Sequence, residues 1–226
     1  MNIGAGAVVA IWNDIREASR ADFYEWHNRE HMPERVAIAG FRRGRRYIAL
    51  EGAPEYFTLY DTDGPHVVAG SEYLARLNAP TSWTRRVTQH FFNVSRSLCR
   101  VDFTTGIAEG GHLMTWRYDV LPGREGEHHA WLLSVLPGLM DCAGIVAVHL
   151  CLADRAASEI PTAEKTTRSE QNLVPAWIVM VEGGAEGESL RACCKQTLPD
   201  AMFYGSGAAQ PVQRGLYRLQ YSRSKS

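Results

Sequence analysis

Residues 23–47 read FYEWHNREHMPERVAIAGFRRGRRY, and no other part of the chain concentrates ionisable side chains in this way. With helical spacing, His27, Glu30, His31 and Glu34 fall at i, i+3, i+4 and i+7 and share one face. A helix face that packs on a sheet is normally apolar. The stretch therefore predicts a helix that presents acid/base groups to a buried layer.

Pro33 interrupts this helix, because proline cannot donate the backbone hydrogen bond that a straight helix needs. We expect the helix of residues 19–36 to kink or restart near Met32, and the segment to end at Gly40. Apolar periodicity and turn residues predict the other elements of the first half. Strands are expected at residues 6–13, 41–50, 56–61 and 95–103, and helical segments at residues 70–77 and 82–92. The order is β-α-β-β-α-β.

The second half of the chain repeats the first. Residues that are hard to substitute recur at an offset of 104, namely Trp12 and Trp116, Pro33 and Pro137, and Gly40 and Gly144. Pro54, Tyr56 and Asp61 match Pro175, Trp177 and Glu182 at an offset of 121, which places 17 inserted residues in a polar surface loop around residues 156–172. We expect two units, residues 1–106 and residues 107–226.

Each predicted unit has the split βαβ order of a ferredoxin-like fold, in which two helices cover one face of a four-stranded antiparallel sheet. The uncovered sheet face must also be buried, and the second copy in the same chain supplies that cover. The sequence thus predicts an α+β protein whose tandem ferredoxin-like units pair through their sheets around a common core. A duplicated two-layer domain without this pairing is the alternative.

An aromatic cluster, an H-x-P motif and a glycine-aromatic step follow one another in the opening stretch, at Phe23, Tyr24, Trp26, His31, Pro33, Gly40 and Phe41. Together with the unit order, this pattern resembles the EthD-like proteins of the dimeric α/β-barrel superfamily. The resemblance implies an intrachain barrel, a pocket between sheet and helices for a small aromatic or polyketide-like ligand, and chains that commonly form homo-oligomers. Its members include cofactor-free monooxygenases, cyclases, decarboxylases, dehydratases, isomerases and some haem proteins, so the resemblance predicts a fold better than a reaction.

His31 is the preferred catalytic residue, because it carries the resemblance and because an imidazole with a pKa of about 6.5 exchanges protons near neutral pH. Glu34 would orient it or act as a second acid/base group, with His27 beside them. The alternative is a purely structural role, in which His31 only makes hydrogen bonds in a helix-sheet core. At the offset of 104, the second unit has apolar residues or glycine at these positions, which predicts one working pocket per chain.

The spacing of His27, Glu30 and His31 also matches the H-x-x-E-H pattern of zinc hydrolases. Such a site needs a third ligand and a straight helix, and Pro33 distorts the helix directly after the motif. A metal held by His27, His31 and a carboxylate such as Glu34 is a second metal alternative. The preferred interpretation uses neither a metal nor an organic cofactor.

The strand after Gly40 places alternate arginines on opposite faces, so at least one guanidinium must approach a buried layer. A buried guanidinium requires an anionic partner, which would be Glu30, Glu34 or a substrate carboxylate or enolate. A salt bridge that only ties the helix to the strand is the competing interpretation. The candidate substrate-binding residues are Trp26, Arg42, Arg46, Tyr47, Tyr60, Asn78, Trp83 and His90.

Composition limits the classes of partner. The formal net charge of −1 argues against nucleic acid or an anionic membrane surface as the main partner. No signal-like leader or membrane span is evident, which predicts a cytoplasmic protein. The five cysteines are odd in number and lack paired zinc spacing, which favours reduced thiols, with Cys193 and Cys194 packed in a helix. His128 and His129 are expected at the surface, and His112 and His149 packed on strands.

These observations predict an EthD-like lyase or isomerase, such as a dehydratase, cyclase or decarboxylase, that uses His-centred acid/base chemistry on a small aromatic or carbonyl compound. Three alternatives remain open: a cofactor-free monooxygenase, a metal-dependent enzyme that uses His27 and His31, and a non-catalytic protein that binds a small ligand.

Overall fold

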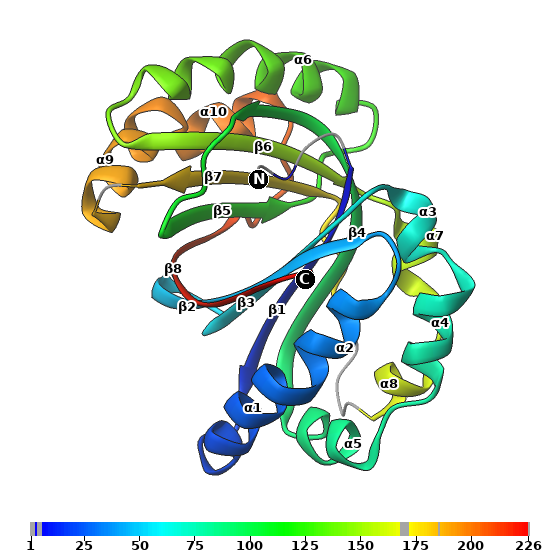
Figure 1. Cartoon of the computed structure of the whole chain (residues 1–226). Helices are drawn as coiled ribbons and strands as arrows, with labels where there is room; N and C mark the ends of the chain where they lie inside the picture. Colours follow the sequence, from blue (N-terminus) through cyan, green and yellow to red (C-terminus); the bar gives the residue numbers. More distant parts are fainter. Residues whose placement is uncertain (1–2, 4–5, 168–171, 185, 226) are drawn as a thin grey trace.

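The structure, a computed structural model, describes residues 3, 6–167, 172–184 and 186–225 (Figure 1). Within them the chain forms eight strands: β1 (Ala7–Ile15), β2 (Phe41–Gly52), β3 (Tyr56–Thr62), β4 (Phe91–Gly106), β5 (His112–Tyr118), β6 (Ile145–Ala153), β7 (Trp177–Gly183) and β8 (Gln213–Ser224). The α-helices are α1 (Arg20–Trp26), α2 (Met32–Ala37), α3 (Pro65–Val68), α4 (Ser71–Asn78), α5 (Ser82–Thr88), α6 (Glu125–Val135), α7 (Arg155–Glu159), α8 (Ala163–Thr166), α9 (Gly187–Thr197) and α10 (Asp200–Ser206). Shorter turns are η1 (Glu17–Ser19), η2 (His27–His31) and η3 (Pro137–Asp141). No helix among the described residues is long and apolar enough to cross a bilayer.

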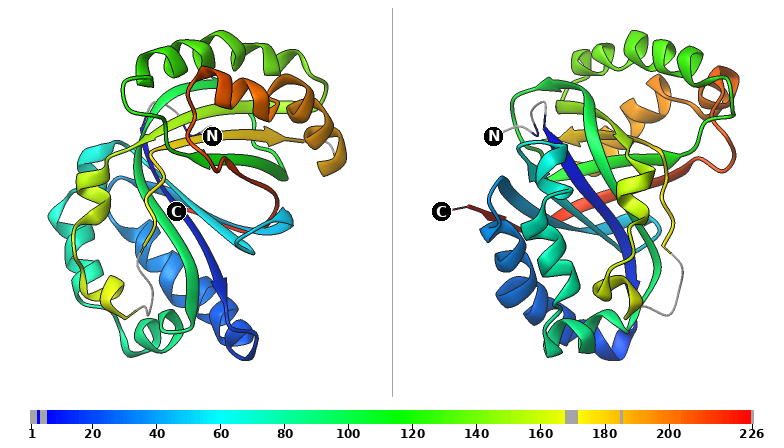
Figure 2. Two further views of the ribbon diagram at one scale, coloured as in Figure 1. Left: turned by 180° about the vertical axis from the view of Figure 1, so that it is seen from behind. Right: turned by 90° about the vertical axis from the view of Figure 1, so that its right-hand side faces the viewer.

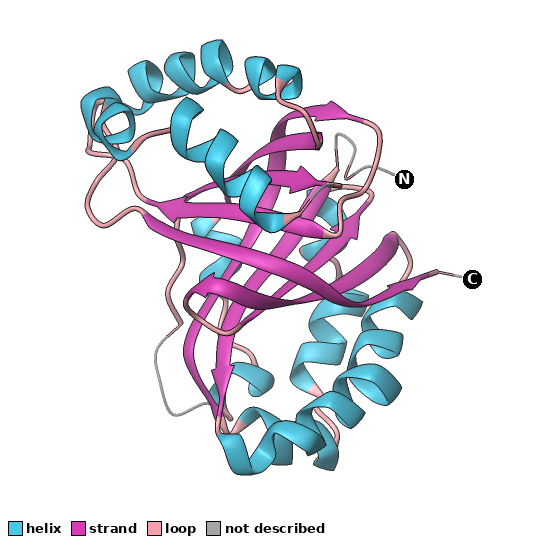
Figure 3. Ribbon diagram, turned by 90° about the vertical axis from the view of Figure 1, so that its left-hand side faces the viewer, coloured by secondary structure: helices cyan, strands magenta, loops and turns pink. Residues whose placement is uncertain are grey.

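The strands close into one antiparallel barrel with the order β1-β3-β2-β8-β5-β7-β6-β4. The first four strands follow the ferredoxin-like order β4-β1-β3-β2, and the last four follow β8-β5-β7-β6. The pairs β2 with β8 and β4 with β6 join the two sheets. Helices cover the outside of the barrel on two opposite sides (Figures 1 and 3). The predicted α+β fold of tandem units that form an intrachain barrel is confirmed, and the division after residue 106 stays a prediction.

The internal repeat is visible in the backbone. Gly40 and Gly144 precede β2 and β6 and have φ angles of +83° and +85°, a left-handed conformation that glycine adopts most easily. The predicted match of Trp12 with Trp116 is wrong by one residue. Trp12 pairs with Phe57, and the residue that pairs with the equivalent Ile178 is Arg117 rather than Trp116. The single-residue shift turns Trp116 to the outer face of its sheet, whereas Trp12 points into the barrel.

The predicted interruption of the first helix takes the form of a single π-helical turn, η2, between α1 and α2. Pro33 lies in the first turn of α2, where its missing N–H costs least. The wider turn ahead of it relieves the proline ring, which would otherwise meet the carbonyl of residue 29. Helix α2 starts at Met32, where the sequence predicts the restart.

Polar side chains cross the otherwise apolar interior of the barrel. The guanidinium of Arg45 lies between two carboxylates, with Nη1 3.0 Å from Glu182 Oε1 and Nη2 3.2 Å from Asp61 Oδ1. His149 Nε2 lies 3.4 Å from the same Glu182 oxygen. Arg45 and His149 occupy equivalent positions of the repeat, as do Asp61 and Glu182, so each unit contributes one base and one acid. These four residues are called the barrel quartet below.

The inserted segment is not the plain surface loop that its composition suggests. It contains α7, which packs on β4, and α8, which lies beside α4 and α5 of the first unit (Figure 2). The side chain of Glu164 on α8 is buried and forms an ion pair with Arg35 on α2. The insertion thus supplies an acid to the first unit, which no local sequence pattern signals. Residues 168–171 of the predicted loop lie outside the described residues.

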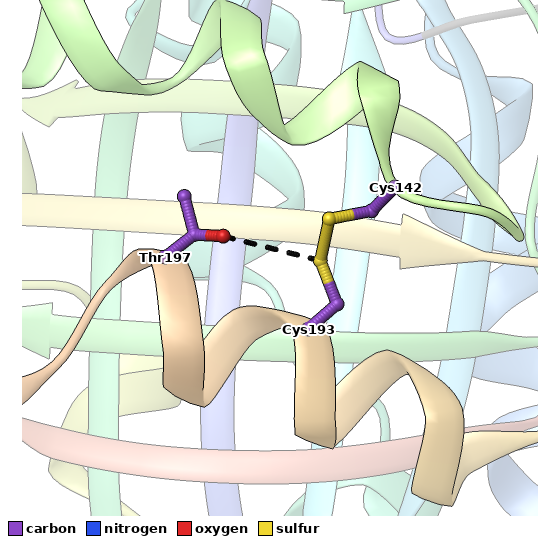
Figure 4. The surroundings of a disulfide bond; sticks show 3 residues. All are labelled: Cys142, Cys193 and Thr197. Atoms are coloured by element: carbon purple, nitrogen blue, oxygen red, sulfur yellow. Dashed lines mark hydrogen bonds between the residues drawn. A yellow bond between two sulfur atoms is a disulfide. The ribbon is translucent and has the colours of Figure 1, made fainter.

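Two cysteines correct the expectation of reduced thiols. Cys142, after η3, and Cys193, on α9, form a disulfide that ties these two elements together (Figure 4). The pair is 51 residues apart in sequence, which explains why spacing gives no indication of it. Cys99, Cys151 and Cys194 are free and buried, so Cys194 is packed in a helix as predicted.

We therefore expect three titratable thiols in the unfolded, unreduced protein and five after reduction. Thiol titration in denaturant checks this count. Cys193→Ser should lower the free energy of unfolding by about 2–4 kcal/mol, because the cross-link restricts the unfolded chain. Cys194→Ser serves as the control for the loss of one cysteine from the same helix. Five titratable thiols without reductant would contradict the disulfide.

The histidines of the second unit are partly misplaced by the sequence analysis. His128 is buried on α6, where Nε2 lies 2.8 Å from Tyr118 Oη and Nδ1 lies 2.8 Å from Ser206 Oγ. The expectation that it lies at the surface is wrong, because its ring fills a pocket between Tyr118 and Phe203. His129 is half-buried beside Asp102. His149 is packed as predicted, whereas His112 is half-buried.

The buried His128 predicts an acid-sensitive stability. Burial lowers the pKa of His128 to about 4. Between pH 6.5 and pH 4, the histidine is therefore protonated in the unfolded chain and neutral in the folded protein. The contribution of neutral His128 to the free energy of unfolding is complete above pH 6.5 and is lost as the pH falls toward 4. The loss is about 2 kcal/mol between pH 7 and pH 5. Urea unfolding of wild type and His128→Gln at both pH values measures it. An equal pH dependence in both proteins would refute the assignment.

Candidate functional site

The polar groups of the opening stretch meet in the layer between the first sheet and the helices that cover it. Helix α1, turn η2 and helix α2 run across the outer face of β2 and β3 (Figure 1). His27, His31, Arg46 and Tyr60 are buried between these elements, each at most 6% exposed. The layer separates two apolar clusters of the first unit, one around Phe23 and one further along the sheet.

Arg46 occupies the centre of this layer. Its Nη1 donates to His27 Nδ1 at 3.1 Å and to Asn28 Oδ1 at 2.9 Å, and its Nε donates to Gln220 Oε1 at 2.7 Å. The rings of Phe23, Tyr24 and Tyr221 surround the guanidinium, with centroids 5.5, 4.9 and 5.5 Å from Cζ. No carboxylate in the described part of the chain forms an ion pair with Arg46, and burial lowers its pKa. Arg46 is therefore a buried cation whose hydrogen-bond partners are all neutral, an arrangement shared by Arg96, which donates to Tyr73 Oη, and Arg117, which donates to the backbone oxygen of Ala53.

His27 is held as a neutral hydrogen-bond acceptor. Burial, reinforced by the nearby His31 and Arg46, lowers the pKa of His27 well below 6.5. Because a guanidinium can only donate, His27 Nδ1 must accept, which leaves the ring proton on Nε2. His27 therefore fixes the orientation of Arg46 and adds no charge to the layer.

His31 lies next to this pair. Its ring centroid is 5.7 Å from that of His27 and 4.3 Å from that of Trp26. Trp26 donates its indole N–H to Thr84 Oγ1 at 3.1 Å, so the indole is fixed as a wall behind the imidazole. The π-helical turn brings both histidines to the buried side, although they no longer share a regular helical face with the following carboxylates.

The two predicted carboxylates take other partners. Glu30 accepts hydrogen bonds from the hydroxyls of Thr81 and Thr84 at the start of α5. Glu34 is partly buried, 3.3 Å from Arg35 and 3.8 Å from Arg76, and its burial raises its pKa. Neither carboxylate is the partner of a strand arginine, which corrects that expectation.

The metal alternatives need further ligands beside His27 and His31. The described residues contain no cluster of three or more histidine, cysteine, aspartate or glutamate side chains with the arrangement of a metal site. Glu30 is directed toward α5 and Glu34 toward two arginines, so the pair formed by His27 and His31 gains no acidic ligand from this helix.

Tyr60 enters the layer from β3. Its hydroxyl is buried, and no described residue forms a hydrogen bond with it. Burial raises the pKa of Tyr60 against the opposing charges of Arg35 and Arg46, so the phenol stays a neutral donor. A glycine at position 44 makes the approach feasible, since a Cβ there would lie 2.8 Å from the ring of Tyr60.

Five predicted binding residues are not part of this arrangement. Arg42 forms a surface ion pair with Asp63, and Tyr47 points into the barrel on the opposite side of the sheet. The other three are bound at the periphery: Asn78 to the backbone of Ala163, Trp83 to Asp22, and His90 to Gln89.

The structure adds residues that the sequence analysis missed. Asn28 and Tyr24 lie inside the predicted stretch but carry no titratable acid or base near neutral pH. Gln220 and Tyr221 come from β8 of the second unit, so the second unit completes the site of the first. The pairing of β2 with β8 brings them there, with Arg46 directly opposite Tyr221. The sequence signal for Gln220 and Tyr221 was the internal repeat, which places the strands of one unit beside those of the other.

Four clefts of about 230–450 Å³ open at other parts of the barrel, and none of them is lined by His27, His31 or Arg46. The side chains of the site are buried, so a substrate reaches them only if side chains of the layer move.

Comparison with known proteins identifies the fold. No protein-family model and no curated protein sequence matches the chain. Among solved structures, an anthrone oxidase-like protein superposes with a TM-score of 0.65 at 13% identity, over 96% of this chain and 92% of that one. A protein of Fusobacterium nucleatum provisionally named a monooxygenase gives 0.60 at 9% identity, over 98% and 96% of the two chains. A ferredoxin-fold protein of Listeria monocytogenes related to antibiotic biosynthesis monooxygenases gives 0.51 at 8% identity, over 97% of each.

Proposed function

We propose that the chain is an enzyme that removes a proton from a small aromatic or other carbonyl compound, with His31 as the general base. The observation that carries the proposal is Arg46, a buried guanidinium whose hydrogen-bond partners are all neutral. A substrate oxygen that becomes negative during the reaction would provide the missing anionic partner.

The proposed step uses only side chains. A ring nitrogen of His31 takes a proton from the carbon next to the carbonyl group, and the bonding electrons move to the carbonyl oxygen. The resulting enolate oxygen faces Arg46, which His27 holds in position, and the neutral phenol of Tyr60 is a second donor. Reprotonation at another carbon completes an isomerisation, and expulsion of a leaving group completes an elimination, so the step serves a lyase or an isomerase.

The resemblance to EthD-like proteins supports the same residue. His31 is the histidine of the H-x-P motif, and the structure places it within the layer that contains Arg46. Glu34 stays a proposed auxiliary acid/base group, because its burial raises its pKa.

A cofactor-free monooxygenase is the second candidate. Two of the three similar structures are named as monooxygenases or as related to them. The chemistry starts with the same proton removal, after which the electron-rich carbon reacts with molecular oxygen. Oxygen uptake during turnover would support this candidate, whereas turnover without uptake supports the lyase or isomerase.

Hydrogen–deuterium exchange tests the shared first step without knowledge of the complete reaction. Small aryl ketones and cyclic diketones are incubated with the protein in heavy water, and NMR follows the loss of the signal of the proton next to the carbonyl. We expect catalysed exchange in at least one compound. Binding of these compounds without catalysed exchange would instead support a non-catalytic ligand-binding protein.

Two further expectations stay predictions. The homo-oligomer that the resemblance implies is measured by sedimentation of the whole chain, and the cytoplasmic location by fractionation of cells.

A further inference from the structure

A surface cleft lies where the end of β2 meets the second unit. The cleft, of about 230 Å³, opens between the end of β2, the strands β5 and β8, and helix α9. Its floor is apolar, formed by Met114, Trp116, Leu198 and Leu216. Its volume is smaller than that of a typical drug-sized pocket and suits a ligand with one ring.

Two buried donors at this cleft lack acceptors. The indole N–H of Trp116 and the Nε–H of Arg214 form no hydrogen bond with any residue between positions 3 and 225 that the structure describes. The two side chains are direct neighbours, because Trp116 pairs with Arg214 across β5 and β8. Trp116 is only 1% exposed, and a buried donor without an acceptor is rare in folded proteins.

The rim of the cleft carries three cations, two of which are paired with carboxylates. Arg191 and Arg214 are both bound to carboxylates, Arg191 to Glu51 and Glu188, and Arg214 to Asp200. Lys195 projects from α9 at the same rim, and none of the described acidic residues lies within ion-pair distance of it. The cleft thus combines an apolar floor, two donors without acceptors and one cation without a counter-ion.

We propose that this cleft binds a small aromatic carboxylate, with its ring on the apolar floor and its carboxylate facing Trp116, Arg214 and Lys195. Both unpartnered atoms are donors, and a donor-only site selects an anion or a carbonyl oxygen over a cation. The site belongs to the second unit and to the end of β2, and shares no residue with the proposed catalytic layer.

Benzoate is the probe, and benzamide is its neutral counterpart of the same shape. We expect benzoate to shift the indole N–H resonance of Trp116, identified by its absence in the spectrum of Trp116→Phe. The affinity for benzamide should be lower than that for benzoate by about tenfold, the value of one charge-assisted contact.

The variant Lys195→Gln separates the cation from the packing, since Lys195 is exposed and its replacement leaves the core intact. It should weaken benzoate binding by about fivefold to tenfold without a change for benzamide. Arg223→Gln, which removes an equal charge from an exposed position of β8 outside the cleft, is the matched control. An unmoved Trp116 resonance, equal affinities for benzoate and benzamide, or equal effects of the two variants would overturn the proposal.

Discussion

His31→Ala is expected to lower the rate of proton exchange by about 10²-fold to 10⁴-fold, because a positioned general base usually contributes that much. His31 is the proposed proton acceptor, because His27, the other histidine described in this layer, already accepts a hydrogen bond from the guanidinium of Arg46. The remaining rate should reflect the Arg46 oxyanion site alone. NMR exchange rates of the wild type and the variant measure the ratio.

The matched control is His66→Ala, which removes an exposed histidine from α3 and should leave the exchange rate unchanged. Circular dichroism and thermal unfolding of both variants show whether the fold is retained, since His31 is buried and packs on Trp26. A folded His31→Ala protein that exchanges protons at the wild-type rate would exclude His31 as the base.

The fold could be predicted because its determinants are local. Gly40 and Gly144 need a left-handed backbone, and Pro33 and Pro137 restrict a helix start, so their recurrence at one offset indicates a duplicated unit. A tryptophan carries no such backbone requirement. Trp12 and Trp116 share chemistry but face opposite sides of their sheets, which is why that match failed.

The candidate site could be predicted only in part, for a related reason. His27 and His31 are close in sequence, and the alternation of β2 separates Arg46 from Arg43 and Arg45, although it does not indicate which face meets the helices. The partners of the charged residues come from a distance. Glu164 reaches Arg35 across 129 residues, and Gln220 reaches Arg46 across 174. Such pairs depend on the tertiary fold, so spacing along the chain cannot reveal them.

The barrel quartet leads to the largest expected effect on stability. Glu182→Gln should lower the free energy of unfolding by about 3–5 kcal/mol, the usual result when one partner of a buried ion pair is removed. The carboxylate faces Arg45 at 3.0 Å and also accepts the backbone N–H of Gly110 at 2.9 Å. Glutamine preserves the shape but leaves Arg45 with Asp61 alone. Urea unfolding at pH 7 measures the loss.

Glu25→Gln is the matched control, because Glu25 and Arg29 form an ion pair 2.7 Å long on the exposed side of the first helical segment. A surface pair of this kind contributes about 0–1 kcal/mol. Equal losses in Glu182→Gln and Glu25→Gln would contradict the quartet as a structural link between the units.

The acid limb of the stability curve gives the sharper test of the quartet. Burial raises the pKa of Glu182. The interactions of its carboxylate, mainly those with His149 and Arg45, outweigh burial and lower this pKa to about 2 from 4.5. A lowered pKa stabilises the fold at pH values above 4.5, and this stabilisation disappears as the pH falls toward 2, by about 3 kcal/mol in total. The difference between wild type and Glu182→Gln should therefore shrink between pH 4.5 and pH 2. A constant difference across that range would mean that Glu182 stabilises the barrel by packing and not by its charge.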